Sequence, residues 1–280
     1  MSFVAGIDVG STYTKVVILN GHEVILGHAL NSTGFKLAEM SRQVYQCALK
    51  NAGLTESDIS YVVATGFGRH MVSFSDAQVT DLTASARGST YFFPKTRTIL
   101  DVGGQTMKAT RIDESARVKS FRLNDKCAAG TGAFLEKTAR YMGYQTAEIG
   151  PLVATSKQQV AISGVCAVFA ESEVINQLSL GSAPADIMHG AMASLVDRSV
   201  QLMKRVQMEP EFTLNGGILR YETMAHVVRE YLKADVNVPP ENLVQLVGAL
   251  GAAILAHRRL QKLNAPADDS LTSAEIKTQN

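Results

Sequence analysis

The sequence has no tryptophan and only three cysteines among its 280 residues. An odd and sparse set of cysteines does not form a disulfide framework, which predicts a reducing compartment, the cytoplasm. The chain also has no excess of either charge, because it contains 27 basic and 26 acidic residues and its net charge is +1. Proteins that bind nucleic acid or an anionic membrane surface need a basic patch, so neither partner is expected.

Long hydrophobic runs are absent as well. The longest apolar stretch without a charge, residues 243–256, is too short to span a bilayer comfortably and contains Gln245, so a buried helix is expected there. A secretory signal is not expected before Phe3. Hydrophobic residues make up 46% of the chain, which is enough for one large or two medium soluble domains with a buried core.

The three cysteines differ in their surroundings. Cys47 falls on a run of apolar residues at helical spacing and is expected in the core. Cys127 lies in a loop of small residues before a helix expected to begin near Ala133, and Cys166 follows a glycine before a second helical run. A helix N-terminus favours a thiolate, which is either reactive or a metal ligand. Cys127 and Cys166 are therefore predicted ligands, although an isolated cysteine is more often simply buried.

Two glycine turns repeat one pattern. The segment 8–15, Asp-Val-Gly-Ser-Thr-Tyr-Thr-Lys, joins two short apolar strands, and so does the segment 101–108, Asp-Val-Gly-Gly-Gln-Thr-Met-Lys. Three residues match at one offset of 93: Asp8 with Asp101, Gly10 with Gly103, and Lys15 with Lys108. This recurrence predicts an internal duplication, in which two α/β domains each point a phosphate-binding hairpin into a shared cleft.

Neither turn is a P-loop or a dinucleotide fingerprint, because neither has that glycine spacing at the start of a helix. Both offer backbone N–H groups and hydroxyls to an anion. Asp8 and Asp101 end strands that face the predicted cleft, where carboxylates can hold hydrated Mg²⁺ and serve ATP hydrolysis. The residues of these turns expected to bind ATP are Gly10, Ser11, Thr12, Thr14, Lys15, Gly103, Gly104 and Gln105.

A third glycine turn, at Gly216 and Gly217, follows a short apolar strand. Glycine lets the backbone approach a flat ring closely, so this turn suits the adenosine end of a nucleotide, with a plain strand-to-helix turn as the alternative. Helices are expected at residues 34–53, 81–88, 185–207, 221–234 and 246–253, and a strand at 61–65. In the longest helix the inward positions are Ile187, Ala191, Leu195, Val196, Leu202 and Met203.

With these turns the chain resembles the acetate kinase, hexokinase, Hsp70 and actin superfamily, whose fold is α/β with duplicated ribonuclease H-like domains around a nucleotide cleft. The expected boundaries are residues 1–95 for the first ATPase half, 96–263 for the second half with the cysteine-bearing helices, and 264–280 for a disordered tail. Within the superfamily, Asn-Asp-Lys-Cys-Ala-Ala-Gly-Thr-Gly at 124–132 and Gly-Val-Cys at 164–166 are similar to the BadF/BadG/BcrA/BcrD ATPase family. That family includes activators of 2-hydroxyacyl-CoA dehydratases and ATP-binding subunits of benzoyl-CoA reductase.

The resemblance implies that two subunits share one four-iron four-sulfur cluster through Cys127 and Cys166, and that hydrolysis of Mg²⁺-bound ATP drives electron transfer at low potential. Two well-placed cysteines per chain agree with a cluster that is commonly held by four thiolates. The implied partners are a larger homologous ATP-binding subunit or a second copy of the chain, catalytic reductase subunits, and ferredoxin as electron donor. Glu171, within two turns of Cys166, is the candidate catalytic relay of nucleotide state, with a solvated helix carboxylate as the alternative.

Thr106 stands where many activators carry an acidic residue. Together with the length of the chain, this favours the smaller ATP-binding subunit of benzoyl-CoA reductase, an oxidoreductase that dearomatises benzoyl-CoA; a homodimeric activator of a 2-hydroxyacyl-CoA dehydratase is the alternative. A small-molecule kinase of the same fold would need the hairpins but no iron. An actin-like filament protein would use the nucleotide only to switch polymerisation.

Overall fold

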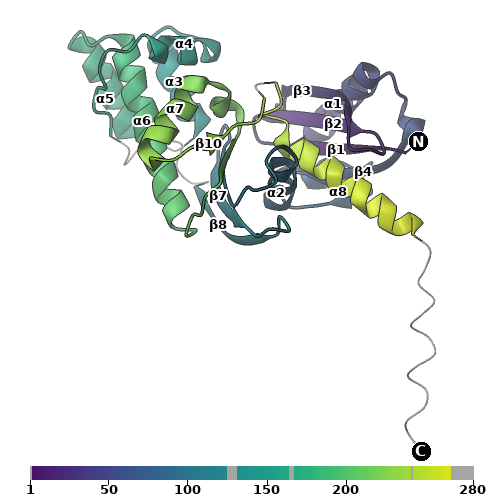
Figure 1. The fold of residues 1–280 in the computed structure, drawn as a ribbon. Coiled ribbons are helices and arrows are strands. Elements are labelled where there is room, and N and C mark those ends of the chain that lie inside the picture. Colours follow the sequence, from purple (N-terminus) through teal and green to yellow (C-terminus); the bar gives the residue numbers. More distant parts are fainter. Residues whose placement is uncertain (1, 125–130, 164–166, 241, 266–280) are drawn as a thin grey trace, which may run out of the picture.

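Two five-stranded mixed sheets form the frame of the molecule in the computed structural model, which describes residues 2–124, 131–163, 167–240 and 242–265 (Figure 1). The strand order is β3-β2-β1-β4-β5 in the first sheet and β10-β9-β6-β7-β8 in the second. In each sheet three consecutive strands pair antiparallel, and the next two strands add in parallel. The two sheets repeat one topology, which confirms the predicted duplicated α/β fold.

The first sheet carries the N-terminal hairpin and is packed against α1 (Leu37–Ala52), among other helices. Its elements are β1 (Phe3–Val9), β2 (Tyr13–Leu19), β3 (Ile25–Ser32), α1, β4 (Ile59–Thr65) and β5 (Ala77–Gln78), with short 3₁₀ helices η1 (Glu56–Asp58) and η2 (Arg69–Met71). Strands β1 and β2 contribute an almost continuous apolar surface, as expected for strands covered on both faces.

Helix α1 corrects one prediction, because Cys47 is exposed rather than in the core. The helix buries Val44, Tyr45 and Ala48 against the first sheet. Each residue turns an α-helix by about 100°, so Cys47 lies about 200° from Tyr45 and faces away from the buried side. The three-residue step from Val44 to Cys47 fits an apolar stripe, but the sheet contact sets the centre of that stripe elsewhere.

The second sheet is covered by a larger group of helices, which gather at the end of the molecule away from the N-terminus (Figure 1). Its elements are β6 (Thr98–Val102), β7 (Met107–Ile112), β8 (Val118–Asn124), α3 (Gly132–Tyr141), η4 (Thr146–Glu148), α4 (Ile149–Ala154), α5 (Ala167–Ser179), α6 (Pro184–Lys204), β9 (Phe212–Asn215), η5 (Gly217–Arg220), α7 (Glu222–Leu232) and β10 (Val236–Asn237). Helix α6 is central, since α3, α4, α5 and α7 all contact it. All six positions predicted to face inward on α6 are buried.

Helix α8 (Val247–Asn264) follows the second sheet in sequence but packs on β1, β2 and β4 of the first. A Cβ atom on Gly6 would lie 2.0 Å from the carbonyl oxygen of Ala249, so glycine is required where helix and strand meet. The helix expected in this region is present, and its small residues let it approach β1 closely. The division into halves at residue 96 stays a prediction, with α8 returning to the first half.

Helix α2 (Asp81–Phe92) lies between the two sheets and beside α8 (Figure 1). It contacts β7, β8 and β9, and it crosses α8 where Gly88 and Gly251 meet. A Cβ atom on Gly251 would lie 1.7 Å from the carbonyl oxygen of Ala84. Within the described ranges, no helix is both long and apolar enough to cross a bilayer.

Candidate nucleotide-binding site

A cleft of about 650 Å³ lies between the two sheets, and both glycine hairpins reach into it. This volume is within the range of small-molecule sites, about 300–1,000 Å³. Most residues predicted to serve ATP line the cleft: Asp8, Gly10, Ser11, Thr12, Lys15, Asp101, Gly103, Gly104, Gln105, Gly216 and Gly217. The structure thus brings together three turns that lie far apart in the sequence.

The two hairpins share their backbone geometry. Each turn closes with the same hydrogen bond, from the N–H of Gly10 to the carbonyl of Tyr13 at 3.1 Å and from the N–H of Gly103 to that of Thr106 at 2.8 Å. Next to the turn of each hairpin, an aspartate and a lysine are cross-strand partners: Asp8 with Lys15 in the first hairpin and Asp101 with Lys108 in the second. Residues directly opposite in an antiparallel pair project from the same face, so each hairpin presents a carboxylate beside an ammonium group.

The duplication extends to a turn that the sequence analysis did not assign to the site. Gly66 after β4 and Gly216 after β9 have φ values of +87° and +106°, in the left-handed region that favours glycine. A Cβ atom on Gly66 would lie 2.6 Å from the carbonyl oxygen of Val9, and one on Gly216 would lie 2.2 Å from that of Val102. The available signal was that a glycine follows a short apolar strand in both places.

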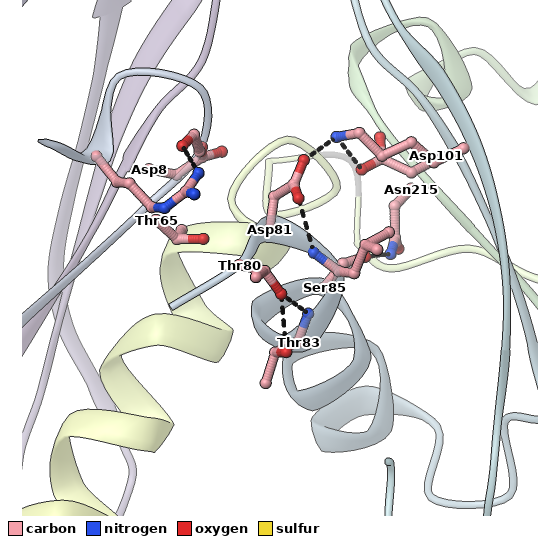
Figure 2. A network of polar contacts seen from close by, with 12 residues as sticks. Asp8, Thr65, Thr80, Asp81, Thr83, Ser85, Asp101 and Asn215 are labelled. Carbon is pink, nitrogen blue, oxygen red and sulfur yellow. Dashed lines mark hydrogen bonds and ion pairs between the residues drawn. The ribbon is translucent and has the colours of Figure 1, made fainter. Parts of the chain in front are cut away.

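The two hairpins differ in their ion pairs. The Nζ of Lys15 lies 2.9 Å from Oδ2 of its cross-strand partner Asp8. The Nζ of Lys108 lies 2.6 Å from Oδ2 of Asp81 and 3.9 Å from Oδ2 of Asp101, so it pairs chiefly with the first residue of α2 (Figure 2). Asp81 was not predicted as a site residue, although the Thr-Asp start of a capped helix marked its position.

Burial and the lysine shift the pKa values of these two carboxyl groups in opposite directions. Burial raises the pKa of Asp101, and the positive charge of Lys108 offsets only part of this effect. Burial alone would also raise the pKa of Asp81, but the charge of Lys108 and its hydrogen bond hold that pKa below its ordinary value. Burial lowers the pKa of Lys108, yet the fields of Asp101 and Asp81 outweigh burial and raise it, so the lysine stays charged.

Thr14 supports the first turn instead of facing the cleft. Its side chain is fully buried, and its hydroxyl shares a 3.0 Å hydrogen bond with the hydroxyl of Thr33, which donates to the carbonyl of Gly10 at 2.8 Å. Side chains alternate between the two faces of a strand. Because Lys15 on β2 faces the cleft, its neighbour Thr14 faces the opposite side.

Helix α3 begins against the second hairpin. The N–H of Gly132 donates to the carbonyl of Gly103, and the N–H of Ala133 donates to the carbonyl of Gly104, both at 2.9 Å. These N–H groups have no partner inside their own helix, so the hairpin satisfies them. Any displacement of this hairpin would therefore act on α3.

Glu171 lies outside the cleft, on α5. Its Oε1 is 2.7 Å from the Nζ of Lys137, and its Oε2 accepts a 3.3 Å hydrogen bond from the hydroxyl of Tyr141. Both partners are on α3, so Glu171 ties α5 to α3. The predicted ligands Cys127 and Cys166 lie outside the described residues, in the segments just before these two helices. Among the residues that are described, no three His, Cys, Asp or Glu side chains come together as a metal site.

The third turn has polar neighbours suited to a base. The guanidinium of Arg220 lies over the ring of Tyr221, 4.8 Å from its centroid, and donates to the Tyr221 hydroxyl at 2.6 Å. That hydroxyl donates in turn to the carbonyl of Thr146. Gln245 lies beside Gly217, since a Cβ atom on Gly217 would lie 2.4 Å from the Nε2 of Gln245. A fixed planar guanidinium next to a glycine backbone suits a flat heterocycle.

Comparison with known proteins agrees with this geometry. The BadF/BadG/BcrA/BcrD ATPase family model matches residues 5–256. The activator of lactoyl-CoA dehydratase from Anaerotignum propionicum is 39% identical, over 93% of this chain and 99% of its own. A benzoyl-CoA reductase subunit from Thauera aromatica is 33% identical, over 94% of this chain and 96% of its own. The crystal structure of (R)-2-hydroxyglutaryl-CoA dehydratase component A from Acidaminococcus fermentans superimposes with a TM-score of 0.89 at 34% identity, covering 93% of this chain and all of that one.

Proposed function

Since the chain belongs to the BadF/BadG/BcrA/BcrD ATPase family, we propose that it is an activator ATPase that couples hydrolysis of Mg²⁺-bound ATP to one-electron reduction of a partner 2-hydroxyacyl-CoA dehydratase. The observation that carries the ATPase part is the pair of matched hairpins that line one cleft. The choice of partner rests on the higher identity to the lactoyl-CoA dehydratase activator than to the benzoyl-CoA reductase subunit. This favours the activator, the alternative in the sequence analysis, over the reductase subunit that Thr106 had favoured.

In the proposed nucleotide complex, the two hairpins hold the phosphates from opposite sides. Their turn N–H groups and the lysines would contact phosphate oxygens, while Asp8 and Asp101 would hold Mg²⁺, which would balance the phosphate charge. In the first hairpin, Lys15 neutralises Asp8 at 2.9 Å. Arrival of Mg²⁺ and phosphate lets both groups exchange partners, so neither charge is left without compensation in the cleft.

The proposal assigns a four-iron four-sulfur cluster to the cysteines, because the helices that follow Cys127 and Cys166 are bound to each other through Lys137 and Glu171. When bound, such a cluster supplies a one-electron carrier, and it commonly takes four thiolates, twice the two predicted ligands of this chain. We therefore propose a homodimer that shares one cluster, works in the cytoplasm and takes electrons from ferredoxin. On and just after α5, Phe169, Ile175 and Leu180 are exposed apolar residues that pairing would cover.

The experiment that tests this function is anaerobic purification, followed by measurement of iron, sulfide, native mass and ATPase activity. The expected protein is a dimer with about four iron atoms and a Mg²⁺-dependent ATPase activity. With a reductant and ATP it should activate a 2-hydroxyacyl-CoA dehydratase rather than complement a benzoyl-CoA reductase. ATP binding without any iron would favour a small-molecule kinase instead.

The cysteine assignment has its own variants. Cys127→Ser and Cys166→Ser should each abolish the cluster spectrum while ATP affinity stays within about twofold, because the hairpins do not contain these residues. Cys47→Ser is the matched control, since Cys47 is an exposed thiol on α1 of the first half. A variant that keeps a full cluster spectrum would remove its cysteine from the ligand set.

A further inference from the structure

Glu136 is a carboxylate on the cleft wall to which the proposed ATPase chemistry gives no role. It lies on α3, is half-buried and lines the cleft. Asp8, Asp81 and Asp101 also line the cleft, and each has a lysine within 4 Å. Glu136 has no hydrogen bond or ion pair with any residue that the structure describes. A half-buried carboxylate in this position is available to accept hydrogen bonds from a ligand.

Helix geometry sets the distance of Glu136 from the second hairpin. At its first turn, α3 is fixed to the second hairpin by the 2.9 Å hydrogen bonds from Gly132 and Ala133. Four residues advance an α-helix by about 6 Å and return to the same face. Glu136 therefore lies on the Gly132 face of α3, one turn further along the helix, and both residues line the cleft. This advance is comparable with the span from the phosphates of a nucleotide to its ribose hydroxyls.

The chemistry of the residues that line the cleft indicates which part of a nucleotide each of them could bind. The residues around the third turn suit the base, and Glu136 suits the ribose. Gly217, Arg220 and Gln245 gather around the third turn, where a base fits, and the guanidinium of Arg220 already donates to Tyr221. An ionised carboxylate only accepts hydrogen bonds, and its two oxygens match two adjacent hydroxyl donors. A ribose diol is the part of a nucleotide that offers such a pair of donors.

We propose that Glu136 accepts hydrogen bonds from the 2′ and 3′ hydroxyls of the bound nucleotide, and so selects ribonucleotides over deoxyribonucleotides. The inference rests on the proposed function only in that a nucleotide occupies the cleft. It also gives α3 two contacts with the ligand site, at the second hairpin and at the sugar one turn later. The helix that follows Cys127 would then report on the whole nucleotide and not only on its phosphates.

The test is calorimetric titration of the full-length protein with ADP, 2′-deoxy-ADP and 3′-deoxy-ADP. The wild type should bind ADP about tenfold or more tightly than either deoxy analogue, as expected for a charged hydrogen bond. Glu136→Ala should weaken ADP binding by a similar factor and bind all three nucleotides equally. Glu136→Gln keeps one acceptor oxygen, so its preference for ADP over the deoxy analogues should lie between those of the wild type and Glu136→Ala. This variant also tests the inference if the alanine variant fails to fold.

The matched control is Glu230→Ala, which removes an exposed helix carboxylate outside the cleft in the same half and should keep the wild-type ratios. A Glu136→Ala or Glu136→Gln variant that keeps the full preference for ADP would overturn the inference, and so would a wild type that binds all three nucleotides equally. In both cases the proposed ATPase function would stand. A wild type that binds no adenine nucleotide would instead refute the proposed function itself.

Discussion

Lys108 pairs with Asp81, at the start of the helix between the two halves, although its cross-strand partner is Asp101. The contact fixes α2 to the second hairpin. A second link comes from Asn215, whose side-chain amide donates to the hydroxyls of Ser85 and Ser89 on α2 at 3.1 and 2.7 Å (Figure 2). Helix α2 is thereby held to the second sheet at two points on one face.

Asp81→Asn should remove the charge that holds α2 to Lys108. Because the pKa of Asp81 is lowered in the folded protein, its ionisation stabilises the fold above its ordinary pKa of 3.8, and this stability is lost as the pH falls through the folded value. The variant should unfold at a lower temperature at pH 7 and should lose part of the acid dependence of the wild type. Thermal melts between pH 3 and pH 7 measure both effects, and an unchanged pH profile would contradict them.

Asp101→Asn should have the opposite effect on stability and a severe effect on activity. The pKa of Asp101 is raised, so between 3.8 and the folded value the native state binds more protons than the unfolded state, and stability falls as the pH rises. Removing the charge should therefore raise the melting temperature of the nucleotide-free protein at pH 7. ATP hydrolysis should fall about 10- to 100-fold as Mg²⁺ is held less well.

Asp8→Asn is the comparison for this experiment, because Asp8 occupies the matched position in the first hairpin. It should lower Mg²⁺-dependent hydrolysis by a similar factor, and both variants should keep the cluster. Normal turnover in both would show that the hairpins do not serve ATP. A melting temperature of Asp101→Asn below that of the wild type would show that the ionised carboxylate is a net stabiliser.

The hairpins could be predicted from the sequence because their chemistry is local. An aspartate, a glycine and a lysine at fixed spacing between two short strands determine a turn, and the repeat of that spacing reveals the duplication. The sequence could also have predicted that Thr14 faces away from the cleft. Successive side chains of a strand point to opposite faces, and its neighbour Lys15 faces the cleft. The long helix α6 followed directly from its apolar period.

The tertiary choices could not be predicted in this way. The partner of Lys108 depends on where α2 lies after both sheets have formed, and nothing near Lys108 in the sequence encodes Asp81. The position of α8 on the first sheet likewise depends on a contact between Gly6 and Ala249, two residues at opposite ends of the chain. For Cys47, the apolar spacing was compatible with a core position, and only the sheet contact decided against it.

The last prediction concerns Glu171, for which a relay of nucleotide state was expected from the sequence. A path from the cleft to this residue is made of contacts: the second hairpin accepts the first N–H groups of α3, and Lys137 on α3 pairs with Glu171 on α5 at 2.7 Å. Movement of the hairpin would thus reach both helices that follow the predicted cluster ligands. Helix N-termini stabilise negative charge, so a shift of these helices changes the potential of a cluster beside them.

Glu171→Gln keeps the shape of the side chain but removes the ion pair. It should leave ATP affinity within about twofold of the wild type and reduce the difference in cluster potential between the nucleotide-free, ADP and ATP states. Potentiometric titration of the three states measures this difference, in which about 59 mV corresponds to a tenfold change in a one-electron equilibrium. Glu222→Gln is the control, because it breaks a comparable ion pair with Arg229 on α7. If Glu171→Gln keeps the full nucleotide-dependent shift, then the coupling between the cleft and the cluster does not run through α3 and α5.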